Sequence, residues 1–190
     1  MKTMLIINGS PRKDGSDSAI LKMLSEKALE FDYTPETIDI CHLEINGCKA
    51  CMACKKSGRC AQKDDMIQLY DKIRSADMLV LASPIYFGGE TGQMKCFMDR
   101  FYAMVSTKNG ERFADLGNVK KASIVLTCGA ADGQMRYGGI LTRLTATMRS
   151  FNVMDVSGSI IPGASPDKIP DMDYVKEYLD GVAFQLEMCS

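Results

Sequence analysis

Four cysteines lie close together in the sequence and are the side chains best suited to bind a metal centre. Their spacing is C-x2-C-x2-C-x5-C, and they are Cys48, Cys51, Cys54 and Cys60. Four thiolates within so short a segment can ligate the corners of one [4Fe–4S] cluster. The spacing therefore predicts that these four residues are cluster ligands.

Other roles for this cysteine segment stay open. Structural zinc usually takes two separated cysteine pairs, so a run this compact fits zinc poorly. A redox Cys-x-x-Cys pair is a further reading, although the segment lacks the thioredoxin-type βαβ setting. Reduced or disulfide-paired structural cysteines are the main alternative to a cluster. The other cysteines are isolated, and we expect each to be a small buried apolar side chain: Cys41, Cys96, Cys128 and Cys189.

A polar segment at residues 8–18 follows the first apolar run and has the groups that an anion needs. Three serine hydroxyls, the Arg12 guanidinium and the free N–H groups of a helix start can together hold a phosphate dianion. The serines are Ser10, Ser16 and Ser18. Asp17 would repel a phosphate unless its carboxylate points elsewhere, so its direction decides its role. In a simpler interpretation, Ser16 and Asp17 only cap the helix.

The segment after the third apolar run places aromatic rings next to glycines. Tyr86 and Phe87 precede Gly88 and Gly89. The rings can contact the face of a flat ring system, while the glycines let backbone N–H groups approach its edge. An ordinary strand-to-helix turn is the alternative. The glycine-rich loop at residues 127–134 could close the other side of the same ring system.

Apolar runs of strand length and apolar stripes of helical spacing alternate along the chain. Residues 4–7, 78–81 and 123–126 are typical of strands buried on both faces. Residues 37–40 suit a strand nearer an edge, and residues 153–156 predict a fifth strand. The helical stripes fall in residues 20–31, 66–73, 94–105, 140–148 and 175–186. This order predicts a doubly wound α/β sandwich, in which ligands bind beyond the carboxyl ends of the strands.

The composition predicts one domain over residues 1–190. Lysines and arginines (23) nearly balance aspartates and glutamates (24), which gives no reason to expect nucleic acid or an anionic membrane as a partner. The first apolar run is too short for a signal sequence or a membrane span, so we expect a cytoplasmic protein.

Three motifs resemble those of the NADPH-dependent FMN reductase branch of the flavodoxin-like fold. They are Gly9-Ser10-Pro11-Arg12 with Gly15-Ser16-Asp17-Ser18, then Ser83-Pro84-Ile85-Tyr86-Phe87-Gly88, then Lys95 with Asp99-Arg100. The resemblance covers residues 2 to 160 without long insertions. It implies a three-layer α/β sandwich whose five-stranded parallel sheet has the order 2-1-3-4-5, with helices on both faces.

The resemblance also implies how FMN is bound. The phosphate is held by Ser10, Arg12, Ser16 and Ser18, in a loop where Asp17 stands at a position that is often Asn in the family. The isoalloxazine is bordered by Pro84, Ile85, Tyr86, Phe87, Gly88 and Gly89, with Thr127 and Gly129 opposite. Members usually form homodimers or homotetramers whose interfaces complete the flavin site. The cysteine spacing is similar to that of iron–sulfur flavoproteins, although flavin reductases of this family can keep such cysteines without a cluster.

The function implied is an oxidoreductase in which NADPH or NADH reduces bound FMN, which then reduces a quinone, a free flavin or another small acceptor. The flavin carries this chemistry, so no catalytic side chain is required, in keeping with a chain whose one histidine is His42. A second hypothesis is an electron carrier in which a [4Fe–4S] cluster exchanges electrons with ferredoxin and FMN. A third is a non-catalytic FMN-binding module.

Overall fold

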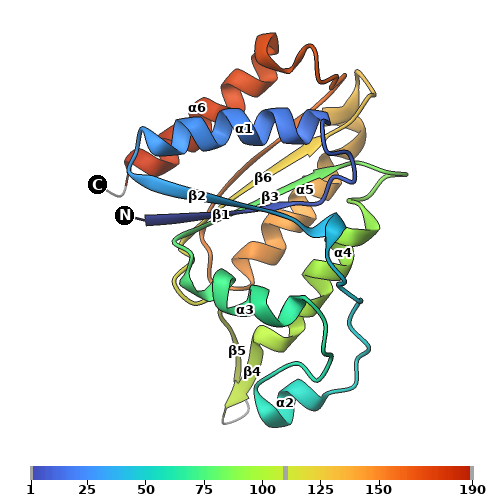
Figure 1. The fold of residues 1–190 in the computed structure, drawn as a ribbon, viewed down its shortest axis with the longest axis vertical. Coiled ribbons are helices and arrows are strands. Elements are labelled where there is room, and N and C mark those ends of the chain that lie inside the picture. Colours follow the sequence, from blue (N-terminus) through green and yellow to red (C-terminus); the bar gives the residue numbers. More distant parts are fainter. Residues whose placement is uncertain (1, 109–110, 189–190) are drawn as a thin grey trace.

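The computed structural model of the chain describes residues 2–108 and 111–188. Its centre is a five-stranded parallel sheet in the order β2-β1-β3-β6-β7 (Figure 1). The strands are β1 (Lys2–Asn8), β2 (Tyr33–Asp39), β3 (Met78–Pro84), β6 (Lys121–Thr127) and β7 (Asp155–Ile161). Counted along the sheet's own strands this order is 2-1-3-4-5, so the predicted flavodoxin-like topology is confirmed.

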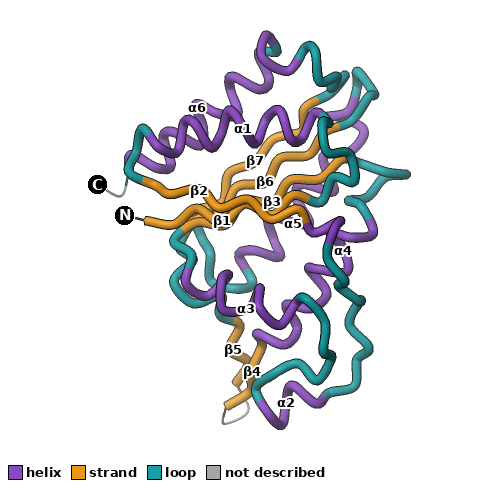
Figure 2. The backbone as a smooth tube through the Cα atoms, viewed as in Figure 1, coloured by secondary structure: helices purple, strands orange, loops and turns teal. Residues whose placement is uncertain are grey.

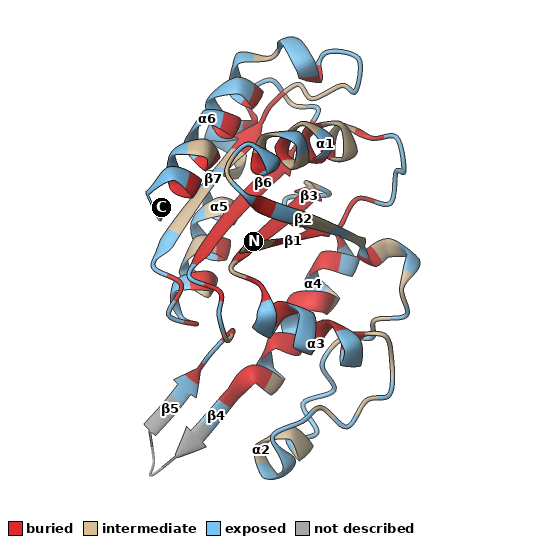
Figure 3. Ribbon diagram, turned by 60° about the vertical axis from the view of Figure 1, so that its left-hand side comes forward, coloured by how far each residue is buried: buried red, intermediate tan, exposed pale blue. Residues whose placement is uncertain are grey.

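Helices cover both faces of the sheet and form a three-layer sandwich (Figure 2). One face carries α1 (Ser16–Leu29) and α6 (Asp173–Glu187), and the other carries α3 (Met66–Ser75), α4 (Gly92–Asp99) and α5 (Gly133–Arg149). Strand β1 shows why its central residues, Met4–Ile7, are all apolar. Met4 and Ile6 pack under α1 and α6, while Leu5 and Ile7 pack against the opposite helices. Successive side chains of a strand face opposite ways, so the central residues of a strand in the middle of the sandwich are buried on both faces (Figure 3).

The sequence pattern predicted one helix over residues 94–105, and this prediction is wrong. Helix α4 ends at Asp99, a 3-10 turn covers Arg100–Met104, and an antiparallel hairpin follows, with β4 (Val105–Lys108) and β5 (Glu111–Ala114). Phe101 and Met104 stay buried in the 3-10 turn, so the apolar spacing continues after the helix has ended. Burial, rather than helix continuation, explains that part of the stripe.

The fifth strand of the sheet also differs from its prediction by two residues at its start. It runs from Asp155 to Ile161 rather than beginning at Val153. Val153 is fully buried in the turn after α5, where Asn152 adopts a left-handed backbone with φ of 63°. The apolar residue at 153 therefore reflects packing at the helix end.

The cysteine segment leaves the sheet after β2 and returns at α3. It contains a short helix, α2 (Ala53–Ser57), which lies beside the β4–β5 hairpin (Figure 1). Lys55 joins the two, because its Nζ donates to the carbonyl oxygens of Tyr102 and Val105 and lies 3.7 Å from the centre of the Tyr102 ring. Within residues 2–108 and 111–188, no helix has the length and apolar character that a membrane crossing requires.

Candidate functional site

The loops after β1 and β3 are tied to one another at the carboxyl end of the sheet. The Gly9 N–H donates to the Ala82 carbonyl (2.8 Å), and the Thr91 hydroxyl donates to the Gly9 carbonyl (2.8 Å). The same Thr91 oxygen accepts the Met94 N–H at the start of α4 (3.2 Å), and the Thr91 N–H donates to the Ser83 hydroxyl (3.0 Å). Thr91 is fully buried, so these bonds fix both loops against each other.

Helix α1 begins without a side-chain cap. Its N-cap is Gly15, which makes no side-chain cap bond, and the first intrahelical bond runs from the Ala19 N–H to the Gly15 carbonyl (3.1 Å). The interpretation in which Ser16 and Asp17 only cap this helix is therefore not confirmed. The first four N–H groups of a helix lack intrahelical partners and carry its positive dipole end, so this helix start can accept an anion.

A cavity of about 220 Å³ lies between these loops and the end of β6. Nine of the thirteen predicted flavin-site residues line it: Ser10, Arg12, Ser16, Asp17, Pro84, Ile85, Tyr86, Thr127 and Gly129. Its lining combines serine hydroxyls, the Arg12 guanidinium and the start of α1 with the 84–86 segment and Gly129. Residues from three strand ends, far apart in the sequence, thus meet around one hollow.

Four predicted residues do not line this cavity: Ser18, Phe87, Gly88 and Gly89. The Ser18 hydroxyl instead donates to the Arg12 carbonyl at 3.4 Å. Phe87 and Gly88 form the tip of a tight turn closed by two backbone bonds between Tyr86 and Gly89 (2.9 and 3.1 Å). Both tip residues have positive φ, 48° and 80°, as a type I′ turn requires, and the Phe87 side chain is fully exposed. This turn projects from the end of the sheet (Figure 1).

Three further residues line the cavity that the sequence did not single out: Gly15, Cys128 and Ala164. Gly15 and Cys128 lie inside loops that the sequence did identify. Ala164 follows β7 and has no chemically distinctive side chain; only the rule that ligands bind beyond strand ends could have indicated it.

Asp17 points inward, from the first turn of α1 toward the end of β6. Its Oδ2 accepts a hydrogen bond from the Thr127 hydroxyl (2.9 Å), and the residue is 2% exposed. Burial raises the pKa of Asp17 to about 6, although the Thr127 hydrogen bond and the nearby Asp17 N–H and Ser10 hydroxyl act in the opposite direction. The carboxyl is therefore held inside the candidate anion site rather than turned away from it.

The four clustered cysteines all line a second, much smaller cavity of about 20 Å³. All seven cysteines in the described part of the chain are free thiols, and Cys189 lies outside it. Ala50 and Met52, between the first three cysteines of the run, have left-handed backbones with φ of 52° and 60°. Such conformations are costly away from glycine and gather at ligand-binding segments.

The cysteine donor set suits an iron–sulfur cluster, and its thiols lie at the surface: Cys48 and Cys51 are exposed, and Cys54 and Cys60 are half-buried. The cavity that they line has room for about one water molecule. Among the described residues no group of three or more Cys, His, Asp or Glu side chains is arranged to hold a metal ion. The segment would have to open before its four thiols could surround a cluster.

Cys60 differs from the other three because it touches a buried ion pair. Arg100 binds the Asp64 carboxylate through both terminal nitrogens and donates to the Asn46 carbonyl (2.8 Å) and the Cys60 Sγ (3.3 Å). The Arg100 and Asp64 side chains are 1% and 4% exposed. Burial opposes ionisation of Cys60, but the Gln62 N–H, the Arg100 charge and hydrogen bonds from Arg100 and Tyr70 lower its pKa below the ordinary value. These interactions therefore favour the thiolate form of Cys60.

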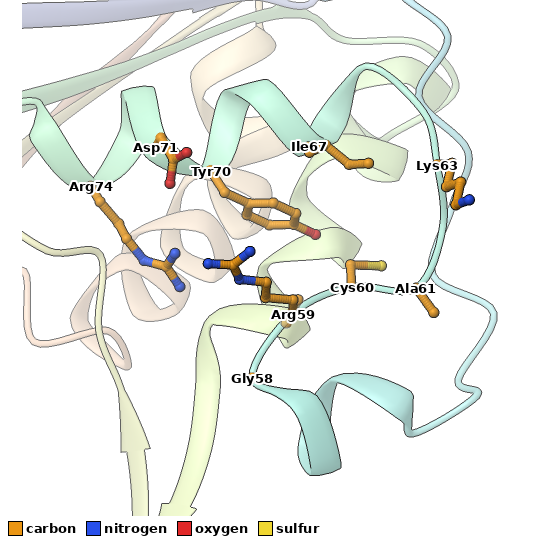
Figure 4. A pocket seen from close by; sticks show the side chains of 10 residues that line it. Gly58, Arg59, Cys60, Ala61, Lys63, Ile67, Tyr70, Asp71 and Arg74 are labelled. Atoms are coloured by element: carbon orange, nitrogen blue, oxygen red, sulfur yellow. The ribbon is translucent and has the colours of Figure 1, made fainter.

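A larger cavity of about 430 Å³ lies beside α3, next to Cys60 (Figure 4). In Figure 4 the Arg59 and Arg74 side chains extend alongside Tyr70 and Asp71. None of the predicted flavin-site residues lines this cavity. The cavity with the larger volume is therefore not the one that the predicted residues line; that one lies at the strand ends, where ligands of open parallel sheets bind.

Comparison with known proteins places this fold and site in a family. The parallel sheet and its loops define a flavodoxin-like α/β protein. The profile of the family described as NADPH-dependent FMN reductase matches residues 1–160. The chain therefore belongs to the NADPH-dependent FMN reductase family, a family of oxidoreductases.

Two curated relatives are both named iron-sulfur flavoprotein. One, from Archaeoglobus fulgidus, is 33% identical over 141 residues, which cover 72% of this chain and 64% of that protein. The other, from Methanosarcina thermophila, is 38% identical over 94 residues, covering 50% of this chain and 49% of that protein. The chain thus spans from about half to just under two thirds of the length of these relatives.

Solved structures show the same fold at low sequence identity. The NAD(P)H:quinone oxidoreductase from Methanothermobacter marburgensis has a TM-score of 0.74 and 17% identity, over 97% of each chain. An FMN-dependent NADH-azoreductase from Bacillus anthracis, solved in complex with FMN, has a TM-score of 0.66 and 15% identity, over 99% of this chain and 97% of that chain. At identities this low, these structural matches establish the shared fold and nothing more specific.

Proposed function

We propose that residues 1–190 form one FMN-binding domain that passes electrons from NADPH or NADH, through bound FMN, to a quinone, a free flavin or another small acceptor. The observation that carries this proposal is the cavity of about 220 Å³ at the carboxyl end of the sheet. Its lining includes both anion-binding groups and the 84–86 segment. The family match supplies the class of reaction.

The phosphate of FMN would bind at the start of α1. Ser10 and Ser16 supply hydroxyls, Arg12 supplies a guanidinium, and the helix supplies N–H groups without intrahelical partners. Ser18 would support this loop from outside the cavity, since its hydroxyl bonds to the Arg12 carbonyl. The residues present therefore fit the phosphate end of the cofactor.

The isoalloxazine would lie between the segment at residues 84–86 and the loop at Thr127 and Gly129. A side-chain carbon added at Gly129, which lines the cavity, would meet only open space, so this wall leaves room for a flat ring. When bound, the flavin supplies the hydride chemistry, and the protein's part is to bind and orient it. Phe87 is fully exposed beside this site, which supports covering by a second subunit in a homodimer or homotetramer.

The phosphate-loop assignment is tested by the double variant Arg12→Ala/Ser16→Ala. Hydrogen bonds to charged groups are worth roughly 1.5–3 kcal/mol each, so the FMN dissociation constant should rise by at least about a hundredfold. Fluorescence quenching of FMN measures it. Lys13→Ala is the matched control, because it removes an exposed positive charge from the same loop. Equal FMN affinity in the double variant and the control would refute the assignment.

The second candidate function is an iron–sulfur electron carrier that exchanges electrons with ferredoxin. Two observations favour it: the four cysteines line one cavity, and both curated relatives described above are named iron-sulfur flavoprotein. Cys51→Ser should remove iron while leaving FMN binding intact, because the two cavities share no residue. Iron content of protein purified anaerobically measures the first effect. Iron-free wild-type protein would exclude this function, and loss of both cofactors would indicate a structural role for Cys51.

A non-catalytic FMN-binding module is distinguished from both candidates by anaerobic reduction. Such a module would bind FMN, yet its flavin absorbance would persist after NADPH or NADH is added. The cytoplasmic location stays a prediction from the sequence.

A further inference from the structure

Asp17 is a buried carboxyl group in the place proposed for a dianion. It lines the same cavity as Ser10, Arg12 and Ser16 and is 2% exposed. Its Oδ2 accepts the Thr127 hydroxyl, whereas its Oδ1 is buried without a hydrogen-bond partner among the described residues. An ionised carboxylate would leave that oxygen desolvated and unpaired, which is the costly arrangement for a charged atom.

Taking the proposed FMN site as its premise, we propose that Asp17 is a neutral carboxylic acid in the FMN complex, and that binding of FMN takes up one proton at this side chain. The proton lies on Oδ1, because Oδ2 already accepts the Thr127 hydroxyl. Oδ1 thereby changes from an unpaired acceptor to a donor. Protonated Asp17 then presents one acceptor, Oδ2, and one donor, Oδ1.

The charges around Asp17 favour this uptake. Arg12 lines the same cavity and is the positive side chain available to the phosphate. Asp39, at the end of β2, lies outside the cavity lining, and its carboxylate accepts a hydrogen bond from the Asn8 amide (2.7 Å). Cys41, in the next turn, has its pKa raised by burial and by the carboxylates of Asp39 and Asp17. Cys128, from the loop after β6, also lines the cavity and has its pKa raised by burial, so it is a neutral thiol.

Before the phosphate arrives, the cavity is lined by one guanidinium, that of Arg12, and one carboxyl group, that of Asp17, while the Asp39 carboxylate lies outside the lining. A phosphate with a charge of about −1.5 to −2 at neutral pH would make this balance strongly negative. Of the two carboxyl groups, Asp17 is the one that lines the phosphate cavity. Protonation of Asp17 relieves the repulsion at the shortest range, where it costs most.

The pKa of Asp17 in the free protein is already raised toward the neutral range. Burial raises the pKa of Asp17 to about 6 without a phosphate present, so at pH 7.5 the group is mostly ionised in the free protein. A nearby dianion raises the same pKa further. The fraction of Asp17 that is protonated therefore rises from the free to the bound state, and FMN binding takes up the corresponding proton.

Isothermal titration calorimetry counts that proton directly. FMN is titrated into flavin-free full-length chain at pH 7.5 in two buffers of different ionisation enthalpy. Wild type and Asp14→Asn, an exposed carboxylate of the same loop, should each take up nearly one more proton than Asp17→Asn. Between pH 7 and 8.5 the wild-type dissociation constant should rise about tenfold per pH unit, and that of Asp17→Asn should stay nearly constant.

Equal proton uptake by wild type and Asp17→Asn would overturn the inference while leaving the FMN site in place. Riboflavin, which has no phosphate, provides a test on wild type alone: uptake with FMN that exceeds uptake with riboflavin is expected, and equal uptake contradicts the inference. FMN binding by none of the three proteins would instead refute the proposed function, and the inference with it.

Discussion

Asp17→Asn should stabilise the flavin-free chain at pH 8 and have little effect on its stability at pH 4. Burial raises the pKa of Asp17 from 3.8 to about 6. Below pH 3.8 the group is protonated in both the folded and unfolded states, so its contribution to stability is fully present. That contribution is lost as the pH rises through 6, because the unfolded chain releases the proton more readily.

The gap between these pKa values sets the size of the effect. At about 1.36 kcal/mol for each pKa unit, holding Asp17 ionised in the folded state costs about 3 kcal/mol at pH 8. Asn keeps an acceptor for the Thr127 hydroxyl and carries no charge, so it should recover most of that free energy.

Urea denaturation of the flavin-free chain at pH 4, 6 and 8 measures this effect. The stability difference between Asp17→Asn and wild type should grow with pH across this range. Asp14→Asn, an exposed carboxylate in the same loop, should show no comparable growth. A difference for Asp17→Asn that is the same at all three pH values would refute the reasoning.

Two further predictions concern the framework around the sites, and urea denaturation measures both. Asp64→Asn removes one partner of the buried Arg100 pair and should lower the free energy of unfolding by about 3–5 kcal/mol, whereas Asp99→Asn, in an exposed pair with Lys95, should cost less than about 1 kcal/mol. Equal losses in these two variants would contradict the role given to the buried pair. Gly117→Ala should cost about 1–3 kcal/mol or more, because φ is +77° and the new carbon would lie 2.4 Å from the Arg74 carbonyl oxygen. Gly181→Ala in α6 meets open space and should be neutral or stabilising, so similar effects at the two glycines would refute the packing argument.

The sheet could be predicted because its strands are buried on both faces. Runs such as Met4–Ile7 contain no polar interruption, and that pattern is specific to interior parallel strands. The β4–β5 hairpin could not be predicted in the same way, since Phe101 and Met104 continue the apolar spacing of α4 while lying in a 3-10 turn. Periodicity reports burial, and several backbone conformations can satisfy it.

The candidate flavin site was predictable where side-chain chemistry is distinctive. Ser10 and Arg12 carry groups that suit a phosphate, while Ala164 carries nothing that a sequence pattern can detect. The direction of the Asp17 side chain depends on its hydrogen bond with Thr127, which lies 110 residues away in the sequence. That direction could therefore be determined only from the folded structure. The contact of Arg100 with Cys60 joins residues 40 positions apart, so it too could be found only in the folded structure.

An anaerobic FMN titration followed by addition of NADPH tests the central claim most directly. The flavin-free chain should bind one FMN, and the flavin absorbance should bleach when NADPH or NADH is added. Arg12→Ala/Ser16→Ala should bind FMN at least about a hundredfold more weakly. A wild-type chain that binds no FMN would contradict the account. If FMN binds but neither NADPH nor NADH reduces it, the chain is a non-catalytic FMN-binding module and the proposed oxidoreductase function is wrong.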